Sequence, residues 1–210
     1  MRIGIFGGCF DPIHLGHLLV ADDVTRKLKL ERVLFIPSFQ PPHRPPPLAS
    51  YPHRKAMVKL AISSNPLFAL CDIEENLPVP SYTINTLQEL RRFFPNDRFY
   101  LIIGYDQYRT IKNWYNCDEI IKLARLVVMS RPGFPKPQLL LGHKPHQVLF
   151  LQVIPVAIAA ADVRKRIVKG MSIRYLVPSL VAHYIYQHRL YQRPAPAANS
   201  KQPKEVKCLQ

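Results

Sequence analysis

Two histidines follow a glycine pair close to the start of the chain, and their spacing suits phosphate chemistry. Residues 7 to 17 read Gly-Gly-Cys-Phe-Asp-Pro-Ile-His-Leu-Gly-His, so His14 and His17 stand at the beginning of an expected helix. Residues three apart lie on one side of a helix, where both imidazoles can donate hydrogen bonds to charge that grows on a phosphate. The spacing is equally compatible with two surface histidines, or with two metal ligands that lack a third.

The residues around the histidines predict a phosphate-binding loop. Residues 2 to 6 are a short apolar run, typical of a buried strand, which stops at Gly7 and Gly8. Two glycines allow a tight turn with exposed main-chain N–H groups, and the following helix directs the positive end of its dipole toward the same place. We expect Gly16, between the histidines, to leave room for a ligand.

The rest of the pattern predicts an α/β fold. Further apolar runs predict strands at 33–36, 68–73, 99–103, 125–129 and 148–153. Helical spacing predicts helices at 15–30, 54–64, 81–94, 116–123, 162–169 and 179–188. Because strands and helices alternate, we expect a doubly wound, mostly parallel sheet with helices on both faces, which binds ligands where its strands end. The proline-rich stretch 37–52 is expected to be a long surface loop.

Length and composition indicate one globular domain. We expect it at residues 1–191 of the 210-residue chain, with a helical part from about 158 to 191. Residues 192–210 are a basic stretch of low hydrophobicity that is expected to be disordered. With no signal peptide and no apolar run of about 18 residues, we expect a cytoplasmic protein without a membrane partner. The four cysteines stand singly, which argues against a disulfide framework or a zinc site.

The formal net charge of +15 predicts anionic partners. The basic residues are spread along the chain and form no aromatic-rich RNA-binding signature or recognition-helix pattern, so no specific nucleic-acid partner is expected. A phosphate-rich small substrate explains the positive charge equally well, and so does a generally basic, solvated surface. A homo-oligomer is compatible with the sequence, which contains nothing that fixes the oligomeric state.

Residues 7–17 resemble the signature of the HxGH nucleotidyltransferase superfamily, and especially of the nicotinate mononucleotide adenylyltransferases of bacterial NAD biosynthesis. Further segments match that family in order along residues 2 to 191. They are Pro-Pro-His-Arg at 41–44, Ser-Tyr-Thr-Ile-Asn-Thr-Leu at 81–87, Ile-Gly-Tyr-Asp at 103–106, Arg-Pro-Gly at 131–133, and the closing segments 173–178 and 184–191. The resemblance implies a Rossmann-like nucleotidyltransferase fold and the transfer of AMP from ATP to nicotinate mononucleotide, which gives nicotinate adenine dinucleotide and pyrophosphate.

The same resemblance implies which residues bind ATP. It assigns catalytic roles to His14 and His17, on the phosphates around the reacting centre, and to Arg164, which binds the ATP phosphates from another helix. It adds main-chain or side-chain contacts to ATP from Gly7, Gly8, Cys9, Phe10, Gly104 and Asp106. Mg²⁺ is expected to be carried by ATP, without a metal site of the protein's own. From the pattern alone, Arg164 is equally an ordinary exposed arginine of a helix.

The mononucleotide is expected under the segment that begins at residue 81. The family positions assigned to it are His43, Arg44, Tyr82, Thr83, Asp106, Trp114 and Arg131. An aromatic face and main-chain N–H groups suit a flat ring that bears a carboxylate. Two of these residues have structural alternatives, because Trp114 can serve as a core anchor and Asp106 as a cap of the next helix.

Several positions depart from the family pattern. Residues 159–161 are three alanines where the family has a Ser/Thr-rich stretch before Arg164, so we expect weaker ATP handling. Cys9 replaces a hydroxyl residue and, beside a helix N-terminus, is expected to be reactive. Tyr105 replaces alanine and is expected to narrow the space beside the nucleotide. The alternatives are an adenylyltransferase for nicotinamide mononucleotide or phosphopantetheine, a nucleotide-binding homologue with weak turnover, and a nucleic-acid-binding module.

Overall fold

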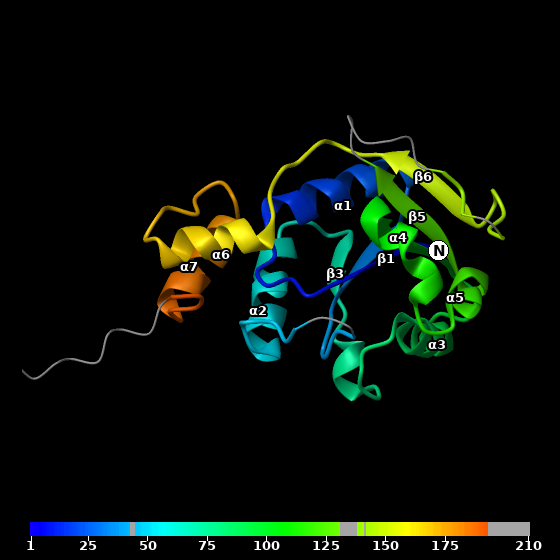
Figure 1. Ribbon diagram of the computed structural model, residues 1–210, viewed down its shortest axis with the longest axis horizontal. Helices are drawn as coiled ribbons and strands as arrows, with labels where there is room; N and C mark the ends of the chain where they lie inside the picture. Colours follow the sequence, from blue (N-terminus) through cyan, green and yellow to red (C-terminus); the bar gives the residue numbers. More distant parts are fainter. Residues whose placement is uncertain (43–44, 131–137, 141, 193–210) are drawn as a thin grey trace, which may run out of the picture.

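One parallel sheet forms the centre of the molecule. The computed structural model describes residues 1–42, 45–130, 138–140 and 142–192. Within these residues, six strands pair in the order β3-β2-β1-β4-β5-β6, all of them parallel (Figure 1). Their bounds are β1 Arg2–Gly8, β2 Arg32–Pro37, β3 Phe68–Leu70, β4 Arg98–Gly104, β5 Ala124–Ser130 and β6 Val148–Gln152. The predicted mostly parallel sheet is confirmed, and every described strand pair is parallel.

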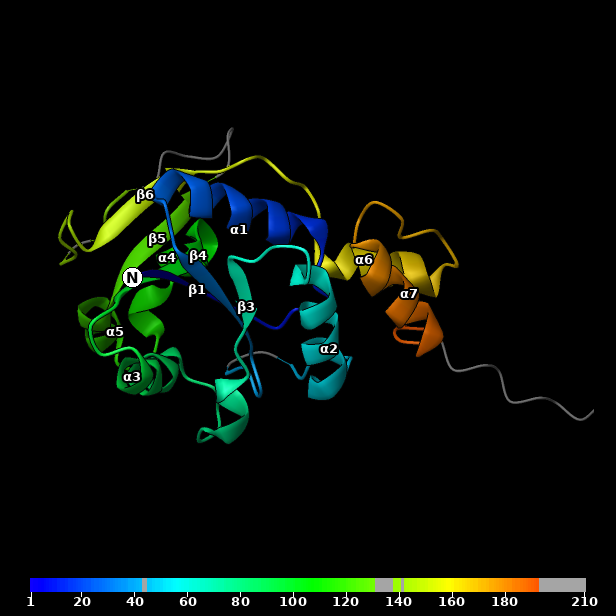
Figure 2. The same cartoon turned by 180° about the vertical axis from the view of Figure 1, so that it is seen from behind.

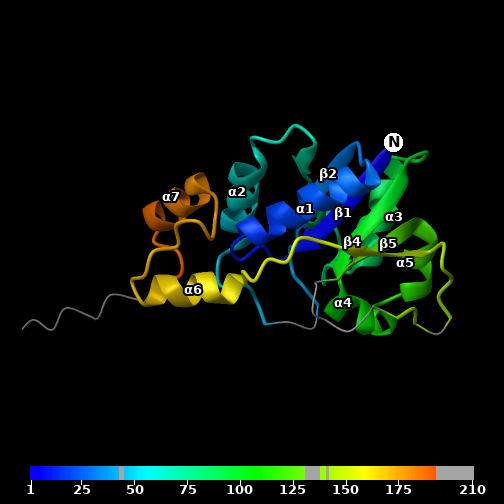
Figure 3. The same cartoon turned by 90° about the horizontal axis from the view of Figure 1, so that it is seen from above.

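Helices cover both faces of this sheet, as predicted. On one face lie α1 (Leu15–Leu28) and α2 (Tyr51–Ile62), and α6 (Ala160–Val168) and α7 (Ser179–Gln187) pack into the same cluster of buried residues. On the other face lie α3 (Thr83–Phe93) and α5 (Cys117–Leu123). Figure 2 shows α1 and α3 on opposite sides of the strands, and Figure 3 shows α6 and α7 beside α2, at the far end of the molecule from α5.

The strand order places a switch point between β1 and β4. The chain winds outward from β1 through β2 to β3, then returns across the sheet to place β4 beside β1, with Arg2 opposite Arg98. The connections that leave β1 and β4 therefore turn away to opposite faces. Ligands of doubly wound sheets bind in the crevice at this point, outside the carboxyl ends of the strands. The residues that follow Gly8 and Gly104 are thus the expected site.

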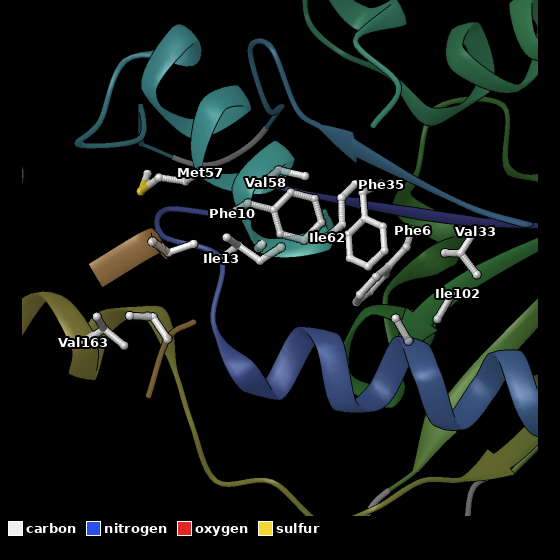
Figure 4. Close-up of a cluster of buried hydrophobic side chains, with 14 of the residues drawn as sticks. Phe6, Phe10, Ile13, Val33, Phe35, Met57, Val58, Ile62, Ile102 and Val163 are labelled. Carbon is white, nitrogen blue, oxygen red and sulfur yellow. The ribbon is translucent and has the colours of Figure 1, made fainter. Parts of the chain in front are cut away.

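Aromatic residues fill the layer between α1 and α2. The rings of Phe6 and Phe35 meet edge to face with centroids 5.5 Å apart, and Phe10 lies 5.8 Å from Phe6. Figure 4 shows these three rings in the space between α1 and α2, with Val58 and Ile62 of α2 next to Phe10. Edge-to-face aromatic pairs add about 0.5–1.5 kcal/mol to the free energy gained by burial. Because Phe10 belongs to the loop after β1, the packing of this layer fixes the position of that loop.

Some predicted boundaries are wrong. Helix α2 begins at Tyr51 rather than 54, and Pro52 lies in its first turn. Proline is tolerated there because the main-chain N–H that it lacks would have no acceptor within the helix. Strand β3 ends at Leu70 and a 3₁₀ turn follows at Ile73–Asn76. Helix α4 (Tyr105–Arg109) and a 3₁₀ turn at Ile111–Asn113 were not predicted, since one or two turns show no periodic pattern.

The outer limits of the chain are only partly described. Of the expected disordered tail, the structure describes Gln192 alone, so that prediction and the domain limits stay predictions. Among the described residues, no helix is both long enough and apolar enough to span a membrane.

Candidate active site

The loop after β1 turns at Phe10, not at the glycines. Gly7 and Gly8 are the last residues of β1 and neither has a positive φ. Phe10 has a φ of 48°, a left-handed conformation that costs a residue with a side chain about 1–2 kcal/mol. Its ring is only 3 % exposed in the aromatic layer, and this burial holds the conformation. The predicted glycine turn is therefore wrong, although the loop lies where it was expected.

The two histidine rings lie against each other at the start of α1. They are stacked with centroids 3.6 Å apart, so the prediction that they face one side is confirmed. The main-chain N–H of His14 donates to Nδ1 of His17 over 3.2 Å. A Cβ on Gly16 would lie 3.0 Å from Nδ1 of His14 and 3.3 Å from Val156. Gly16 thus leaves room for the ring of His14, not for a ligand as expected.

His17 is neutral at physiological pH. Burial, together with the neighbouring His14, lowers the pKa of His17 well below its usual value of 6.5. Because Nδ1 accepts the hydrogen bond from His14, the proton of the neutral ring is assigned to Nε2. The ring is held edge to face by Phe10, with centroids 5.1 Å apart. His17 therefore offers one oriented N–H donor.

This lowered pKa predicts a pH-dependent stability that depends on His17. Above about pH 6.5 the ring is neutral in both the folded and the unfolded protein; below it, the unfolded chain binds the proton more readily than the folded protein does. Between pH 7.5 and 5.5, wild type is therefore expected to lose more unfolding free energy than His17→Gln, by up to about 1.4 kcal/mol. Urea unfolding at the two pH values measures this, with His146→Gln, at an exposed position, as the control. Equal losses in wild type and His17→Gln would refute it.

Asp11 is a buried residue that connects three separate segments of the chain, and it was not predicted as a site residue. Its carboxylate accepts hydrogen bonds from the main-chain N–H groups of Leu48 and Ala49 over 2.8 and 3.0 Å. The hydroxyl of Tyr191 donates to it over 2.7 Å. Nη1 of Arg164 donates to the main-chain carbonyl of Asp11 over 2.5 Å and lies 3.8 Å from its carboxylate. Arg164 is thereby held against the loop after β1.

The start of α6 lacks a side-chain cap. The helix begins at Ala160, two residues before the prediction, and its N-cap is Ala159, which makes no side-chain hydrogen bond. A Ser or Thr at this position would bind a main-chain N–H of the first turn and stabilise the helix by about 1 kcal/mol. The three alanines therefore remove a helix cap close to Arg164.

A cavity of about 520 Å³ opens at the switch point, on the α3 side of the strand ends. Its walls include seven of the predicted site residues: Gly7, Gly8, Cys9, Tyr82, Thr83, Asp106 and Trp114. The walls do not include five others: Phe10, His14, His17, Gly104 and Arg164. Three predicted residues, His43, Arg44 and Arg131, lie outside the described part of the chain. The cavity thus brings seven predicted residues together, whereas the histidine pair and Arg164 lie outside its walls.

Aromatic side chains form one wall of the cavity. The rings of Tyr82 and Tyr115 lie 4.8 Å apart, and Trp114 lines the cavity beside them. Trp114 also packs against the buried cluster on the α3 face. Trp114 therefore anchors the core as well as lining the cavity, and its predicted contact with the mononucleotide stays a prediction.

The end of β4 is shaped around the carboxylate of Asp106. A Cβ on Gly104 would collide with Oδ1 of Asp106, so any larger residue at this position would displace that carboxylate. Gly104 is the N-cap of α4, and its N–H donates to Oε1 of Gln107 over 3.1 Å. Asp106 is thus a cavity residue and not the helix cap. Tyr105 does not line the cavity, and its hydroxyl accepts a hydrogen bond from the N–H of Gln138. Its predicted place beside the nucleotide stays a prediction.

A buried carboxylate, Glu74, supports the cavity wall and was missed from the sequence. It is only 6 % exposed and accepts hydrogen bonds from the hydroxyl of Thr86 over 3.0 Å and from the N–H of Phe39 over 3.2 Å. Burial raises the pKa of Glu74, although bonds from Ser81 and Thr86 oppose the change. Its partners come from distant segments, so no local pattern indicates the residue.

Arg54 of α2 is a second buried charge that was missed. Its side chain is 1 % exposed and donates three hydrogen bonds, all to main-chain carbonyls. The acceptors are Ala49 at 3.2 Å, Cys9 at 2.7 Å and Phe39 at 3.4 Å. Arg54 therefore joins the loop after β1 to the proline-rich loop.

The cavity wall includes one thiol, Cys9, which we expect to be alkylated first. Burial raises the pKa of Cys71 and of Cys117, which makes both less reactive. In a Cys208→Ser background, iodoacetamide followed by peptide mapping is expected to label Cys9 several times faster than the other two, and ATP is expected to slow this labelling. Equal labelling of the three thiols, with no effect of ATP, would show that Cys9 has no special environment.

The sequence model of the cytidylyltransferase-like family matches residues 5–174. A protein of Thermus thermophilus named "Probable nicotinate-nucleotide adenylyltransferase" is 43 % identical over 192 residues, which span 91 % of this chain and 100 % of that protein. A protein of the same name from Syntrophotalea carbinolica is 39 % identical over 91 % of this chain and 98 % of its own.

Solved structures share the fold. Nicotinic acid mononucleotide adenylyltransferase of Plasmodium falciparum, complexed with NaAD, superposes with a TM-score of 0.76. It is 21 % identical and covers 90 % of this chain and 97 % of its own. Together with the family match over most of the chain, the identity to the bacterial relatives decides the assignment. The chain belongs to the cytidylyltransferase-like family, among the nicotinate-nucleotide adenylyltransferases.

Proposed function

We propose that this protein transfers AMP from ATP to nicotinate mononucleotide and releases pyrophosphate, as a step of NAD biosynthesis. The observation that carries the proposal is the arrangement around Gly7–Cys9. A cavity with an aromatic wall lies on one side of this loop, and the stacked histidines and Arg164 lie on the other. Two substrates that must meet at one phosphorus suit such a two-sided site.

The reaction asks for alignment and for stabilisation of charge. An oxygen of the mononucleotide 5′-phosphate forms a bond to the α-phosphorus of ATP, and the bond from that phosphorus to the bridging oxygen of pyrophosphate breaks. Nε2 of His17 donates to the charge that grows on the phosphate oxygens, and Arg164 binds the departing pyrophosphate. The second histidine, His14, fixes the ring of His17 through stacking and through its main-chain N–H.

The cavity binds the mononucleotide in this proposal. The pyridine ring lies against Trp114, and the carboxylate of Asp106 accepts hydrogen bonds from ribose hydroxyls. Thr83 is the first residue of α3, and a helix start offers N–H groups that have no acceptor within the helix. The N–H of Tyr82 already donates to the carbonyl of Pro80 over 2.7 Å. The main chain at Thr83 is therefore the better partner for the nicotinate carboxylate.

Mg²⁺ enters with the triphosphate. Among the described residues, no three His, Cys, Asp or Glu side chains gather so as to hold a metal ion. Mg²⁺ keeps several waters and binds mainly through substrate phosphates, so it does not require such a group. When bound, the ion neutralises charge on the phosphates of ATP.

Replacement of Thr83 by proline tests the substrate assignment. Proline is tolerated at the first helical position, and it removes the N–H that is proposed to bind the carboxylate together with the side-chain hydroxyl of threonine. We expect kcat/KM for nicotinate mononucleotide to fall by about 10- to 100-fold, because a hydrogen bond to a charged group contributes about 1.5–3 kcal/mol. Thr83→Ala, which keeps the N–H, is the matched control.

Nicotinamide mononucleotide completes the test, because it is neutral where nicotinate is charged. Wild type is expected to prefer nicotinate, and Thr83→Pro to lose most of that preference. A wild type that uses both mononucleotides equally would make the nicotinate assignment wrong. Absence of dinucleotide from either substrate would make the adenylyl transfer itself wrong.

A further inference from the structure

Among the residues that the structure describes, no carboxylate lies within the 4.0 Å of an ion pair from the buried cation Arg54. The three hydrogen bonds that its side chain donates go to main-chain carbonyl oxygens. Burial lowers the pKa of Arg54, while Cys9 and Asp11 oppose the change, and an arginine stays protonated in proteins. A positive charge therefore lies inside the protein, 2.7 Å from the carbonyl of Cys9.

The three carbonyls belong to two loops that border the site. Cys9 lies in the loop after β1, and Phe39 and Ala49 lie near the two ends of the loop that joins β2 to α2. This second loop lines the cavity through Pro41 and Pro42. A guanidinium holds its donors in a rigid plane, so one side chain fixes the relative position of all three carbonyls.

Arg54 contributes its charge to a group of four buried or half-buried charges. Asp11 is buried 3.8 Å from one cation, Arg164, and lies close enough to Arg54 to affect its pKa. Arg54 in turn lowers the pKa of the buried carboxyl of Glu74. Two arginines thus face two carboxylates, and loss of Arg54 would leave an excess of negative charge behind the loop after β1. Because fields act strongly in a low dielectric and salt screens buried charges less than exposed ones, an anionic ligand on this loop meets a more favourable potential with Arg54 than without it.

Packing alone does not explain a cation at this position. The neighbours of Arg54 on the same face of α2 are Met57, Val58 and Ala61, all buried and apolar. Taking an ion out of water costs several kcal/mol, and buried ionic groups are often replaced by apolar residues without loss of stability. The position of Arg54 is thus better explained by the two loops that it joins.

We propose that Arg54 is a positioning residue for adenylyl transfer, which holds the loop after β1 against the cavity-lining proline loop and adds positive potential to the polyphosphate site. This inference rests on the proposed function, since the phosphate ligand is the one named there. Geometry and charge are its two components, and two substitutions separate them. Arg54→Lys keeps the charge and loses the planar fork, whereas Arg54→Met loses both.

The experiment compares these variants with Arg91→Met in the full-length protein. Arg91 also donates to main-chain carbonyls, those of Phe94, Pro95, Asp97 and Leu123. These lie at the opposite end of the strands, where β4 and β5 begin. The readouts are the thermal midpoint, the Kd of ATP without mononucleotide, kcat/KM for dinucleotide formation, and the alkylation rate of Cys9. The last reports the loop geometry without turnover.

Arg54→Lys is expected to lower kcat about tenfold and leave the Kd of ATP within about threefold, because the charge remains. Arg54→Met is expected to weaken ATP binding about tenfold or more as well. Arg91→Met is expected to keep ATP affinity and kcat/KM within about twofold, whatever its thermal midpoint. Both Arg54 variants are expected to change the alkylation rate of Cys9.

Two results would overturn the inference: folded Arg54 variants with wild-type ATP affinity, kcat/KM and Cys9 alkylation, or an Arg91→Met variant with the same losses. If Arg54→Met does not fold, Arg54→Lys decides alone through kcat and the alkylation rate. A wild type that binds ATP but forms no dinucleotide contradicts the proposed function, and ATP affinity and Cys9 alkylation then still decide the role of Arg54.

Discussion

Replacement of His17 by alanine is expected to lower kcat for adenylyl transfer by about two to three orders of magnitude, the usual effect of removing one oriented donor to transition-state charge. The donor is Nε2 of a neutral ring, whose orientation is fixed by the N–H of His14 and by the edge of Phe10. His17 does not line the cavity, so KM for the mononucleotide is expected to stay within about threefold. Initial rates at saturating ATP measure both constants.

His17→Gln is the informative companion, because its amide can still donate to a phosphate oxygen. It is expected to recover part of the activity that alanine loses. His146→Ala, at an exposed position, is the control for a general effect of removing a histidine. Unchanged kcat with a raised KM in His17→Ala would mean that the ring only binds the substrate in its ground state, contrary to the role assigned to it.

Asp11→Ala is expected to cause the largest loss of stability of any substitution at the site, about 3–5 kcal/mol. Its carboxylate is 6 % exposed and accepts from two main-chain N–H groups and from the hydroxyl of Tyr191. Alanine leaves these donors without an acceptor and removes the negative charge next to Arg164. Urea unfolding at pH 7.5 measures the change in unfolding free energy.

Asp22→Ala is the control for this substitution. Asp22 pairs with Arg26 across one turn of α1, and both side chains are exposed. Such a pair contributes about 0.3–0.5 kcal/mol, so the control is expected to be nearly neutral. A loss of unfolding free energy below about 1 kcal/mol in Asp11→Ala would mean that water replaces the carboxylate and that Asp11 does not hold together the segments whose donors it binds.

The alternation of strands and helices was sufficient to predict the sheet. Long apolar runs such as 99–103 and 125–129 fell in β4 and β5, and their parallel pairing follows from the helices between them. Short elements such as α4 and the 3₁₀ turns have no such pattern. The turn at Phe10 was also hidden, because a left-handed phenylalanine is held by tertiary packing and not by its own preference.

The candidate site could be predicted where it depends on a local motif. Positions such as His14 and His17 follow from spacing on one helix. Glu74 could not be found, since its partners Phe39 and Thr86 come from other segments. Arg54 did leave a signal: it stands on the apolar stripe of α2 with Met57, Val58 and Ala61, where a charge requires buried partners.

The three alanines before Arg164 change the start of α6 and not the position of the arginine. They leave α6 without a side-chain cap, but Arg164 still reaches the loop after β1 through its bond to Asp11. Affinity for ATP is therefore the property that these alanines are expected to change, and the position of the arginine is retained.

The fate of the ATP phosphates tests the proposed transfer of AMP from ATP to nicotinate mononucleotide. Protein is incubated with Mg²⁺, nicotinate mononucleotide and ATP that carries label on the α-phosphate or, separately, on the γ-phosphate. Adenylyl transfer predicts that α-label appears in the dinucleotide and γ-label in pyrophosphate, in equal amounts, and that His17→Ala slows both together. Label from the γ-phosphate on the mononucleotide, or release of ADP without dinucleotide, would contradict it.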